Sequence, residues 1–217
     1  MRFLYTCLVC FFFQLSNPVN AQETYDLIFK NGTLSDIAKE SILVYDRNIQ
    51  IREQKEASER EVGKIQLSFE PEDMARLKFH KGEKFRNLGE FPATVGNPII
   101  MYFVESVIRD VSRNAGGSPF YIRNRIKASL LQKVPIEDVA LPFGGNDIPA
   151  KQITLRPFLN DKNRSKMRGY EDLALTITMS DKVPGWYYSL VADTKPSKGE
   201  GPVYTNALKL VPERTTQ

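Results

Sequence analysis

The chain has 217 residues, of which 41% are hydrophobic, and its 30 lysines and arginines against 26 acids give a net charge of +4. This charge is too small for a dedicated nucleic-acid binder, whose contacts to the phosphate backbone require a strong positive field. The single histidine excludes metal sites built from several histidines and leaves one candidate base for a catalytic triad.

The first 21 residues have the three parts of a secretory signal peptide. Arg2 supplies a positive start, and an apolar run of about 12 residues follows from Leu4. Small or apolar residues at Val19 and Ala21 favour cleavage after Ala21. The run is shorter than the roughly 18 to 20 residues that span a bilayer, so a cleaved signal is favoured over an uncleaved anchor. We therefore predict export, to a bacterial periplasm or to the extracellular space.

The only two cysteines, Cys7 and Cys10, lie inside this segment. The predicted mature chain, residues 22–217, therefore has no thiol for a disulfide, a metal site or nucleophilic catalysis. It is long enough for one hydrophobic core, and it contains no later apolar stretch that could span a membrane. We expect a single mature domain, with a division near residues 97 and 135 as the alternative.

The first part of the mature chain is expected to form mainly strands. The apolar run Tyr25–Phe29 precedes an Asn-Gly turn signal and favours a strand followed by a turn. Alternating and β-branched residues predict strands over Ser41–Arg52 and Ile65–Phe69. The charge-dense stretch between them, residues 52–64, is expected to be a solvated hairpin tip or loop.

The next segment is expected to be less regular. Pro71 followed by two acids favours a short helix from Glu70 to about Leu77, because acids suit the positive end of a helix. Glycines, a proline and scattered charges over His80–Thr94 predict an irregular connection with one short strand. His80 itself lies in a basic, polar setting and is expected to be a surface or turn residue rather than a catalytic base.

The segment Asn97–Lys133 is expected to form two helices joined by a tight corner. Asn97 can cap the first helix, and Pro98 suits its first position. Gly116-Gly117 can end this helix in the left-handed conformation, and a second pair of cap and proline follows at once. The side chains expected to be buried are Ile100, Phe103, Val104, Val107, Ile108 and Val111 in the first helix, and Phe120, Ile126, Leu130 and Leu131 in the second.

From Pro135 onward the pattern changes to strands. The turn cluster Gly144–Asp147 separates two strand-like runs. Leu173–Met179 then alternates strictly between apolar and smaller or polar residues. With the runs that begin at Trp186 and Val203, it predicts an antiparallel meander of three strands.

Strands, a central helical hairpin and further strands are typical of an α+β fold rather than of repeated βαβ units. We therefore predict antiparallel β-strands, arranged as a sandwich or a curved sheet with a C-terminal three-stranded meander, around the helical hairpin. Whether the two strand groups join in one sheet is left open by the sequence.

Positive charge is concentrated in the helical hairpin. From Arg109 to Lys133 there are six bases and one acid, a net charge of +5, whereas the rest of the mature chain sums to −2. Convergent guanidinium groups bind phosphates and carboxylates, so this segment is a candidate anion-binding surface. The alternative is that its arginines pair with acids elsewhere in the fold. The candidate binding residues are Arg109, Arg113, Arg123, Arg125 and Lys127.

One aromatic residue joins these candidates. Strand alternation places Trp186 and Tyr188 on one face and Tyr187 on the other. Trp186 is expected to lie in the core, as most aromatic residues on strands do. Tyr187 shares its face with Ser189 and is the better candidate for an exposed ring that stacks on a sugar or a partner.

The sequence shows no catalytic motif: it has no nucleophile elbow, no phosphate-binding loop and no HExxH zinc motif. Adjacent acids such as Glu137 and Asp138 fit helix starts or loops better than a pair of glycosidase carboxylates. We therefore predict no catalytic, cofactor or metal residues, and we expect a non-enzymatic exported protein that binds an anionic polymer or an acidic protein surface. A structural component of the cell envelope with internally paired arginines is the alternative, and a wall-glycan or peptide hydrolase is the least favoured.

Overall fold

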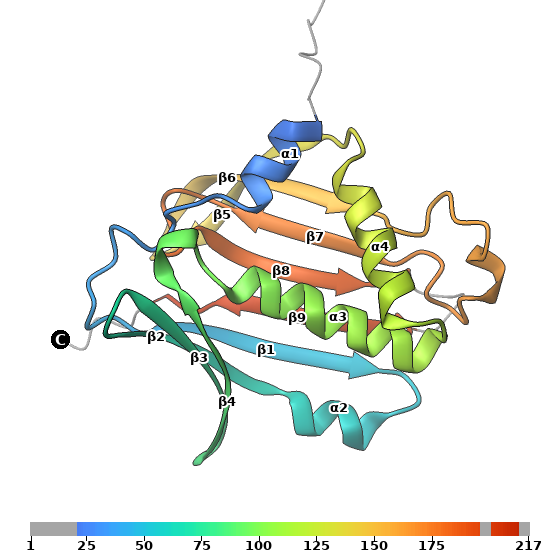
Figure 1. Ribbon diagram of the computed structural model, residues 1–217, viewed down its shortest axis with the longest axis horizontal. Coiled ribbons are helices and arrows are strands. Elements are labelled where there is room, and N and C mark those ends of the chain that lie inside the picture. Colours follow the sequence, from blue (N-terminus) through green and yellow to red (C-terminus); the bar gives the residue numbers. More distant parts are fainter. Residues whose placement is uncertain (1–20, 196–200, 213–217) are drawn as a thin grey trace, which may run out of the picture.

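The computed structural model describes residues 21–195 and 201–212 (Figure 1). The predicted signal peptide lies outside these residues except for Ala21, so its cleavage stays a prediction. The helices are α1 (Ala21–Ile28), α2 (Lys55–Glu61), α3 (Ile99–Ala115) and α4 (Pro119–Leu130), with short 3-10 turns η1 (Ala93–Val95) and η2 (Arg164–Lys166). The strands are β1 (Leu43–Ile51), β2 (Gly63–Glu70), β3 (Met74–Lys81), β4 (Lys84–Pro92), β5 (Ile136–Phe143), β6 (Asn146–Leu155), β7 (Ala174–Met179), β8 (Tyr187–Asp193) and β9 (Tyr204–Leu210).

All nine strands form one antiparallel sheet in the order β4-β3-β2-β1-β9-β8-β7-β6-β5. The strands before the helices and the strands after them each form a meander, and the pairing of β1 with β9 joins the two groups. This arrangement confirms the predicted α+β class and the C-terminal meander of β7, β8 and β9. It also answers the question that the sequence left open, since the two strand groups share one sheet.

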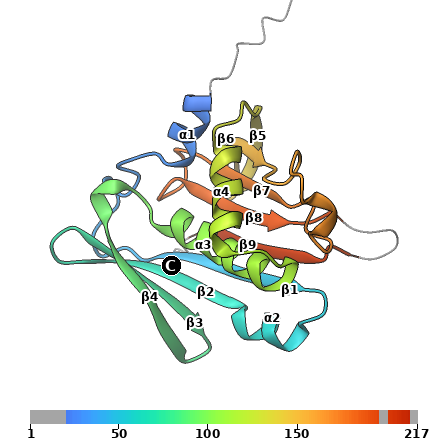
Figure 2. The same ribbon diagram turned by 45° about the vertical axis from the view of Figure 1, so that its right-hand side comes forward.

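Helix α3 lies across one face of this sheet (Figures 1 and 2). Helix α4 covers the same face at the side of β6 and β7. Strands β3 and β4 turn out of the plane of the central strands (Figure 2). Because β4 leads through η1 into α3, the sheet edge and the helix flank each other at the N-terminal end of α3. A cleft lies between these two elements.

The helical hairpin is present as predicted. Asn97 accepts a hydrogen bond from the backbone nitrogen of Ile99 at 3.0 Å, so it caps α3. Gly116 and Gly117 both have positive φ and form the corner. Ser118 caps α4 by accepting from the backbone nitrogen of Tyr121 at 3.2 Å.

The buried face of α4 differs from the prediction at both ends. Ile122, Ile126 and Leu130 are buried, whereas Phe120 and Leu131 are among the most exposed large apolar residues of the described chain. Phe120 is the second residue of α4, and Leu131 is the residue just after its end. Both therefore lie at an end of α4, where the chain changes direction. The helical spacing that predicted a buried face for the whole segment does not apply at these two positions.

Four predictions for the first part of the mature chain differ from the structure. Residues 25–29 lie in and directly after helix α1, not in a strand. The expected helix at 70–77 is a hairpin between β2 and β3, in which Glu72 and Asp73 both adopt positive φ. The charged stretch 52–64 connects β1 to β2 but contains helix α2, and the segment 80–94 contains the nine-residue strand β4 where one short strand was expected. At 70–77 and 80–94 the short local signals were outweighed by antiparallel pairing with neighbouring strands.

The sheet has an apolar inner face against α3 and a more polar outer face. Leu190 of β8 pairs with Leu208 of β9, and both are buried on the inner side. On the outer side of β6 and β7, Gln152 donates to Thr178 and Thr154 pairs with Thr176. The inner face and the helices together form one hydrophobic cluster, to which α1, α3, α4 and the strands of both meanders contribute.

A buried polar cluster interrupts this core beneath α3. Asp110 of α3 accepts a hydrogen bond from the hydroxyl of Tyr204 at 3.0 Å and one from the amide of Asn206 at 3.3 Å. Asn206 also donates to Ser106, which donates to a backbone carbonyl of its own helix. Burial raises the pKa of Asp110 above its ordinary value, and the hydrogen bonds and nearby arginines offset this only in part.

Asp110→Asn is expected to stabilise the protein at pH 7, because the folded state holds this carboxylate in a place that disfavours its charge. A folded-state pKa above the unfolded value means that stability is lost as the pH rises through the folded pKa. The gain from the variant should therefore shrink as the pH falls through the folded-state pKa, and it should be absent below the ordinary value of 3.8. Urea unfolding at several pH values measures this, and a variant less stable than the wild type at pH 7 would contradict it.

Candidate functional site

The cleft between α3 and β4, which we call the α3–β4 cleft, is the one that arginines of both elements line. It has a volume of about 590 Å³. It is lined by Glu61, Arg86, Asn87, Leu88, Phe91, Met101, Tyr102, Glu105, Arg109, Asp110 and Arg113. Charged side chains gather at one end and Leu88, Phe91 and Met101 at the other.

One side of α3 supplies the wall of the cleft. Met101, Glu105, Arg109 and Arg113 are spaced four residues apart, so they form a single stripe along the helix. The stripe follows from the amphipathic pattern of α3, whose opposite side is buried against the sheet. The predicted shared face of Arg109 and Arg113 is therefore the face that lines the cleft.

Each acid of the cleft already has at least one partner. Glu61 accepts from Arg47 at 2.5 Å and from Arg86 at 3.4 Å, and Glu105 accepts from Arg123 at 2.8 Å. Asp110 accepts from Tyr204, and its contact with Arg109 is longer, at 3.9 Å. Counting Arg47 and Arg123 with Arg86, Arg109 and Arg113, five arginines face three acids, so the cleft keeps a positive balance.

Arg47 lies buried beside this cleft. It occupies an inward position of β1 between Tyr45 and Ile49, and its side chain has no solvent exposure. Its guanidinium lies 5.7 Å from the ring centroid of Tyr102. Its Nε and Nη2 atoms have no hydrogen-bond partner among the described residues. Burial alone would raise the pKa of Glu61, but the hydrogen bond and charge of Arg47, with the charge of Arg86, lower it overall.

The remaining predicted cations lie on α4 and do not line the cleft. Arg123 pairs with Glu105 of the neighbouring helix, and Arg125 pairs with Asp161 at 2.7 Å. Lys127 is exposed. The structure thus separates the predicted basic surface into two parts: arginines of α3 that line a cleft, and arginines of α4 that pair with acids.

The expected exposure of Tyr187 is wrong. Its ring is 1% exposed, and its hydroxyl donates to the carbonyl of Ile28 at 2.6 Å. A register shift between Thr178 and Met179 lies opposite the start of β8, so simple alternation fails at this point. Tyr188 lies instead under the ammonium group of Lys209.

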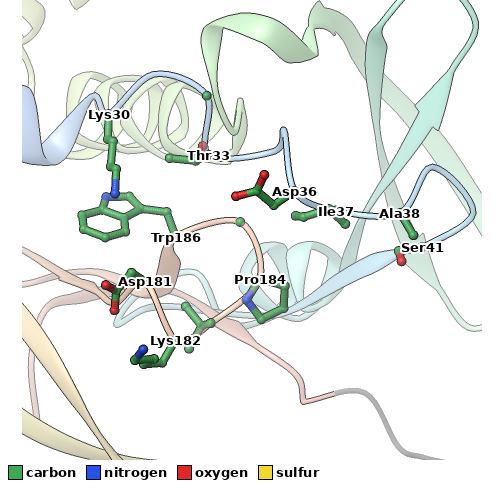
Figure 3. A pocket seen from close by; sticks show the side chains of 13 residues that line it. Lys30, Thr33, Asp36, Ile37, Ala38, Ser41, Asp181, Lys182, Pro184 and Trp186 are labelled. Atoms are coloured by element: carbon green, nitrogen blue, oxygen red, sulfur yellow. The ribbon is translucent and has the colours of Figure 1, made fainter.

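Trp186 lies in the core as predicted, at the edge of a second hollow of about 510 Å³ (Figure 3). Its indole N–H donates to the carbonyl of Leu27, and the ammonium of Lys30 lies 4.0 Å from its ring centroid. Figure 3 shows Asp36 and Asp181 on facing segments of this hollow. Since Lys30 covers the indole and charges of both signs line the walls, this hollow has no free aromatic platform and is the weaker candidate.

Arg113 also lines a third, polar hollow of about 720 Å³ at the C-terminal end of α3. This hollow contains Arg168 and Lys195 as well as Glu171 and Asp172. The charged end of the α3–β4 cleft therefore opens toward further polar surface rather than ending at an apolar wall.

Sequence reasoning missed Arg86, Glu61 and Arg47. Arg86 lies in β4, which was expected to be irregular, and Glu61 lies in a stretch expected to be a loop. Arg47 could have been predicted, because alternation along β1 places it on the same face as Tyr45 and Ile49. A charged residue at an inward strand position indicates either a partner or a site.

Within the described residues, no three histidine, cysteine, aspartate or glutamate side chains are grouped as a metal site would require. His80 lies on β3 with its ring 5.8 Å from that of Phe85, and it does not line the α3–β4 cleft. No helix in the described part of the chain is long and apolar enough to cross a membrane.

Two comparisons with known proteins found no match. No protein-family model matches the chain, and no curated protein sequence matches it. The geometry of the α3–β4 cleft is therefore the basis for assigning a function.

Proposed function

We propose that this is an exported, non-enzymatic protein that binds an anionic ligand in the α3–β4 cleft. The observation that carries the proposal is that Arg86, Arg109 and Arg113 line one cleft in which arginines outnumber acids. Arg86 shares Glu61 with Arg47, Arg109 has only a 3.9 Å contact with Asp110, and the exposed Arg113 has no ion pair among the described residues. Guanidinium groups bind carboxylates and phosphates through paired hydrogen bonds, and each such charged contact is worth roughly 1.5 to 3 kcal/mol. Export rests on the signal-peptide pattern of residues 1–21.

The alternative, a structural component with internally paired arginines, is supported by the pairs of α4 and by the contacts of Arg47 and Arg86 with Glu61. Arg123 and Arg125 each have an acid partner, and these pairs connect α4 to α3 and to the loop after β6. Arg113 differs from them, because it is exposed and lines two hollows. The two functions therefore make different predictions for α3 and for α4.

Arg109→Glu combined with Arg113→Glu is expected to weaken binding of pyrophosphate at least tenfold while the fold survives. Pyrophosphate is the probe because it presents charge without an apolar part. Binding is measured from shifts of backbone amide signals in two-dimensional NMR at low ionic strength, and it should weaken as salt is added. The shifts in the wild-type protein are expected along the second half of α3 and along β4.

Lys127→Glu combined with Lys133→Glu is the matched control, since it makes the same change in net charge on exposed residues outside the cleft. It should bind pyrophosphate like the wild type. Equal losses in both double variants would mean that only net charge matters, and the cleft would lose its assignment. Circular dichroism and thermal unfolding show whether each variant is folded.

A further inference from the structure

An apolar groove continues from the α3–β4 cleft toward α1. It has a volume of about 430 Å³ and lies between α1, the end of β4, η1 and the start of α3. Its apolar lining consists of Tyr25, Phe29, Phe91, Pro92, Val95, Pro98, Ile100, Met101 and Tyr187. We call this space the apolar groove.

The rim of the apolar groove exposes large apolar side chains to solvent. Tyr25 is 45% exposed, Val95 64% and Met101 48%. They are three of the nine large hydrophobic residues that the described chain leaves exposed, and they come from three separate segments. The fold thus gathers apolar surface at one place, which is typical of a binding groove rather than of scattered surface residues.

The apolar groove and the α3–β4 cleft are continuous. Phe91 and Met101 line both spaces, so the groove leads directly into the cleft. From Met101 to Arg113 the stripe on α3 runs over twelve residues, or roughly 18 Å at 1.5 Å per residue. An acyl chain that spans one leaflet of a bilayer is about 15 Å long. The cleft alone is therefore about as long as one acyl chain, and the apolar groove extends the space beyond Met101. The two together leave room for an acidic head at the arginines and an acyl chain at the apolar end.

We infer that the ligand is a single-chain anionic amphiphile. Its acidic head contacts Arg86, Arg109 and Arg113, and its acyl chain lies along Met101 and Phe91 into the apolar groove. This inference rests on the proposed anion-binding function and adds the chemical class of the ligand. Phosphate and carboxylate heads share the same recognition by guanidinium groups, so the structure defines the class by charge and chain rather than by one head group.

Each methylene that is buried in the groove should strengthen binding about fourfold, the fold-change that corresponds to about 0.8 kcal/mol. Butyl, hexyl and octyl phosphate, each used below the concentration at which it forms micelles, test this by calorimetry against the wild-type protein. Affinity is expected to rise steeply along the series. Octyl glucoside, which has the same chain without the charge, should bind at least tenfold more weakly than octyl phosphate.

Val95→Gln combined with Met101→Gln should remove most of the dependence on chain length while pyrophosphate binding persists. Both side chains are exposed, so the core is left intact. Phe120→Gln combined with Leu131→Gln is the matched control, because it makes two exposed apolar residues of the α4 region polar outside the groove. This control should keep the full dependence on chain length.

The outcomes separate the inference from the proposed function. If pyrophosphate binds and affinity does not change with chain length, the amphiphile is ruled out and the anion site stands. If neither pyrophosphate nor the alkyl phosphates bind, both are wrong. A chain-length effect that the Val95 and Met101 variants leave unchanged places the chain elsewhere. Two further results would overturn the inferred amphiphile. One is self-association of the wild type that the Val95 and Met101 variants abolish. The other is binding to anionic phospholipid vesicles without binding of the alkyl phosphates.

Discussion

Glu61→Gln is expected to destabilise the protein by about 3 to 5 kcal/mol, the loss that follows when one partner of a buried ion pair is removed. The Arg47 side chain is completely buried, and its Nη1 atom lies 2.5 Å from Glu61. Arg47 has no other ion-pair partner in the described part of the chain, and its Nε and Nη2 atoms have no hydrogen-bond partner there. Without the carboxylate, the guanidinium charge would remain in the core with only the more distant charge of Asp110 acting on it.

The loss should depend on pH in a defined direction. The pKa of Glu61 in the folded protein lies below its ordinary value of 4.5, because the hydrogen bond and charge of Arg47 outweigh the effect of burial. The carboxylate therefore contributes stability above the ordinary pKa and loses it as the pH falls through the folded pKa. The difference between wild type and variant, measured by urea unfolding, should be largest near pH 7 and should narrow in acid.

Two further variants make this result interpretable. Glu56→Gln removes an exposed carboxylate from the same helix and should change stability by less than about 0.5 kcal/mol. Arg47→Met removes the buried charge and keeps much of the volume, so it should cost less than Glu61→Gln, as replacement of buried pairs by apolar residues is often tolerated. If Arg47→Met were the more damaging variant, the packing of the guanidinium rather than its charge would be the main contribution.

Asn97→Ala is expected to cost about 3 to 4 kcal/mol, because one side chain connects three parts of the core. Its amide nitrogen donates to the hydroxyl of Tyr45 at 2.8 Å and to the carbonyl of Gly185 at 2.9 Å. Its Oδ1 accepts from the backbone nitrogen of Ile99, the first residue of α3. Loss of a cap costs about 1 kcal/mol, and each buried polar group left without a partner costs about 1 to 3 kcal/mol.

Asn97→Asp separates these contributions, since it keeps the acceptor for Ile99 and removes the donors to Tyr45 and Gly185. It should retain the cap and still lose most of the stability that Asn97→Ala loses. Asn124→Ala, at an exposed position of α4, is the control and should be neutral within about 0.5 kcal/mol. Chemical unfolding of the four proteins measures the series. A loss below about 1 kcal/mol for Asn97→Ala would contradict the connecting role.

Local signals were sufficient where a segment is long and periodic. The helical hairpin followed from caps, glycines and an apolar face, and Leu173–Met179 followed from strict alternation. They were insufficient where the segment is short or where pairing partners are distant. Residues 70–77 carried a helix signal, but pairing of β2 with β3 requires a tight turn there, in which Glu72 and Asp73 take positive φ.

The candidate site shows the same division. Arg109 and Arg113 were found from their charge and spacing, because four-residue spacing on a helix fixes a shared face whatever surrounds it. Tyr187 was placed wrongly because a register shift opposite β8 interrupts the alternation on which the argument depended. Arg86 could not be found, because its role depends on β4 lying beside α3, which no local pattern encodes.

The sequence by itself determined the α+β class, the two central helices and the concentration of positive charge between Arg109 and Lys133. These are properties of neighbouring residues, and neighbouring residues interact in any fold. Only the tertiary structure decided which of those charges are paired. Arg123 and Arg125 each pair with an acid from another segment, whereas Arg109 has only a 3.9 Å contact with its neighbour Asp110 and the exposed Arg113 lines the cleft. Pairing of charges depends on distances between residues far apart in the chain, and the packing of α3 against a curved sheet sets those distances.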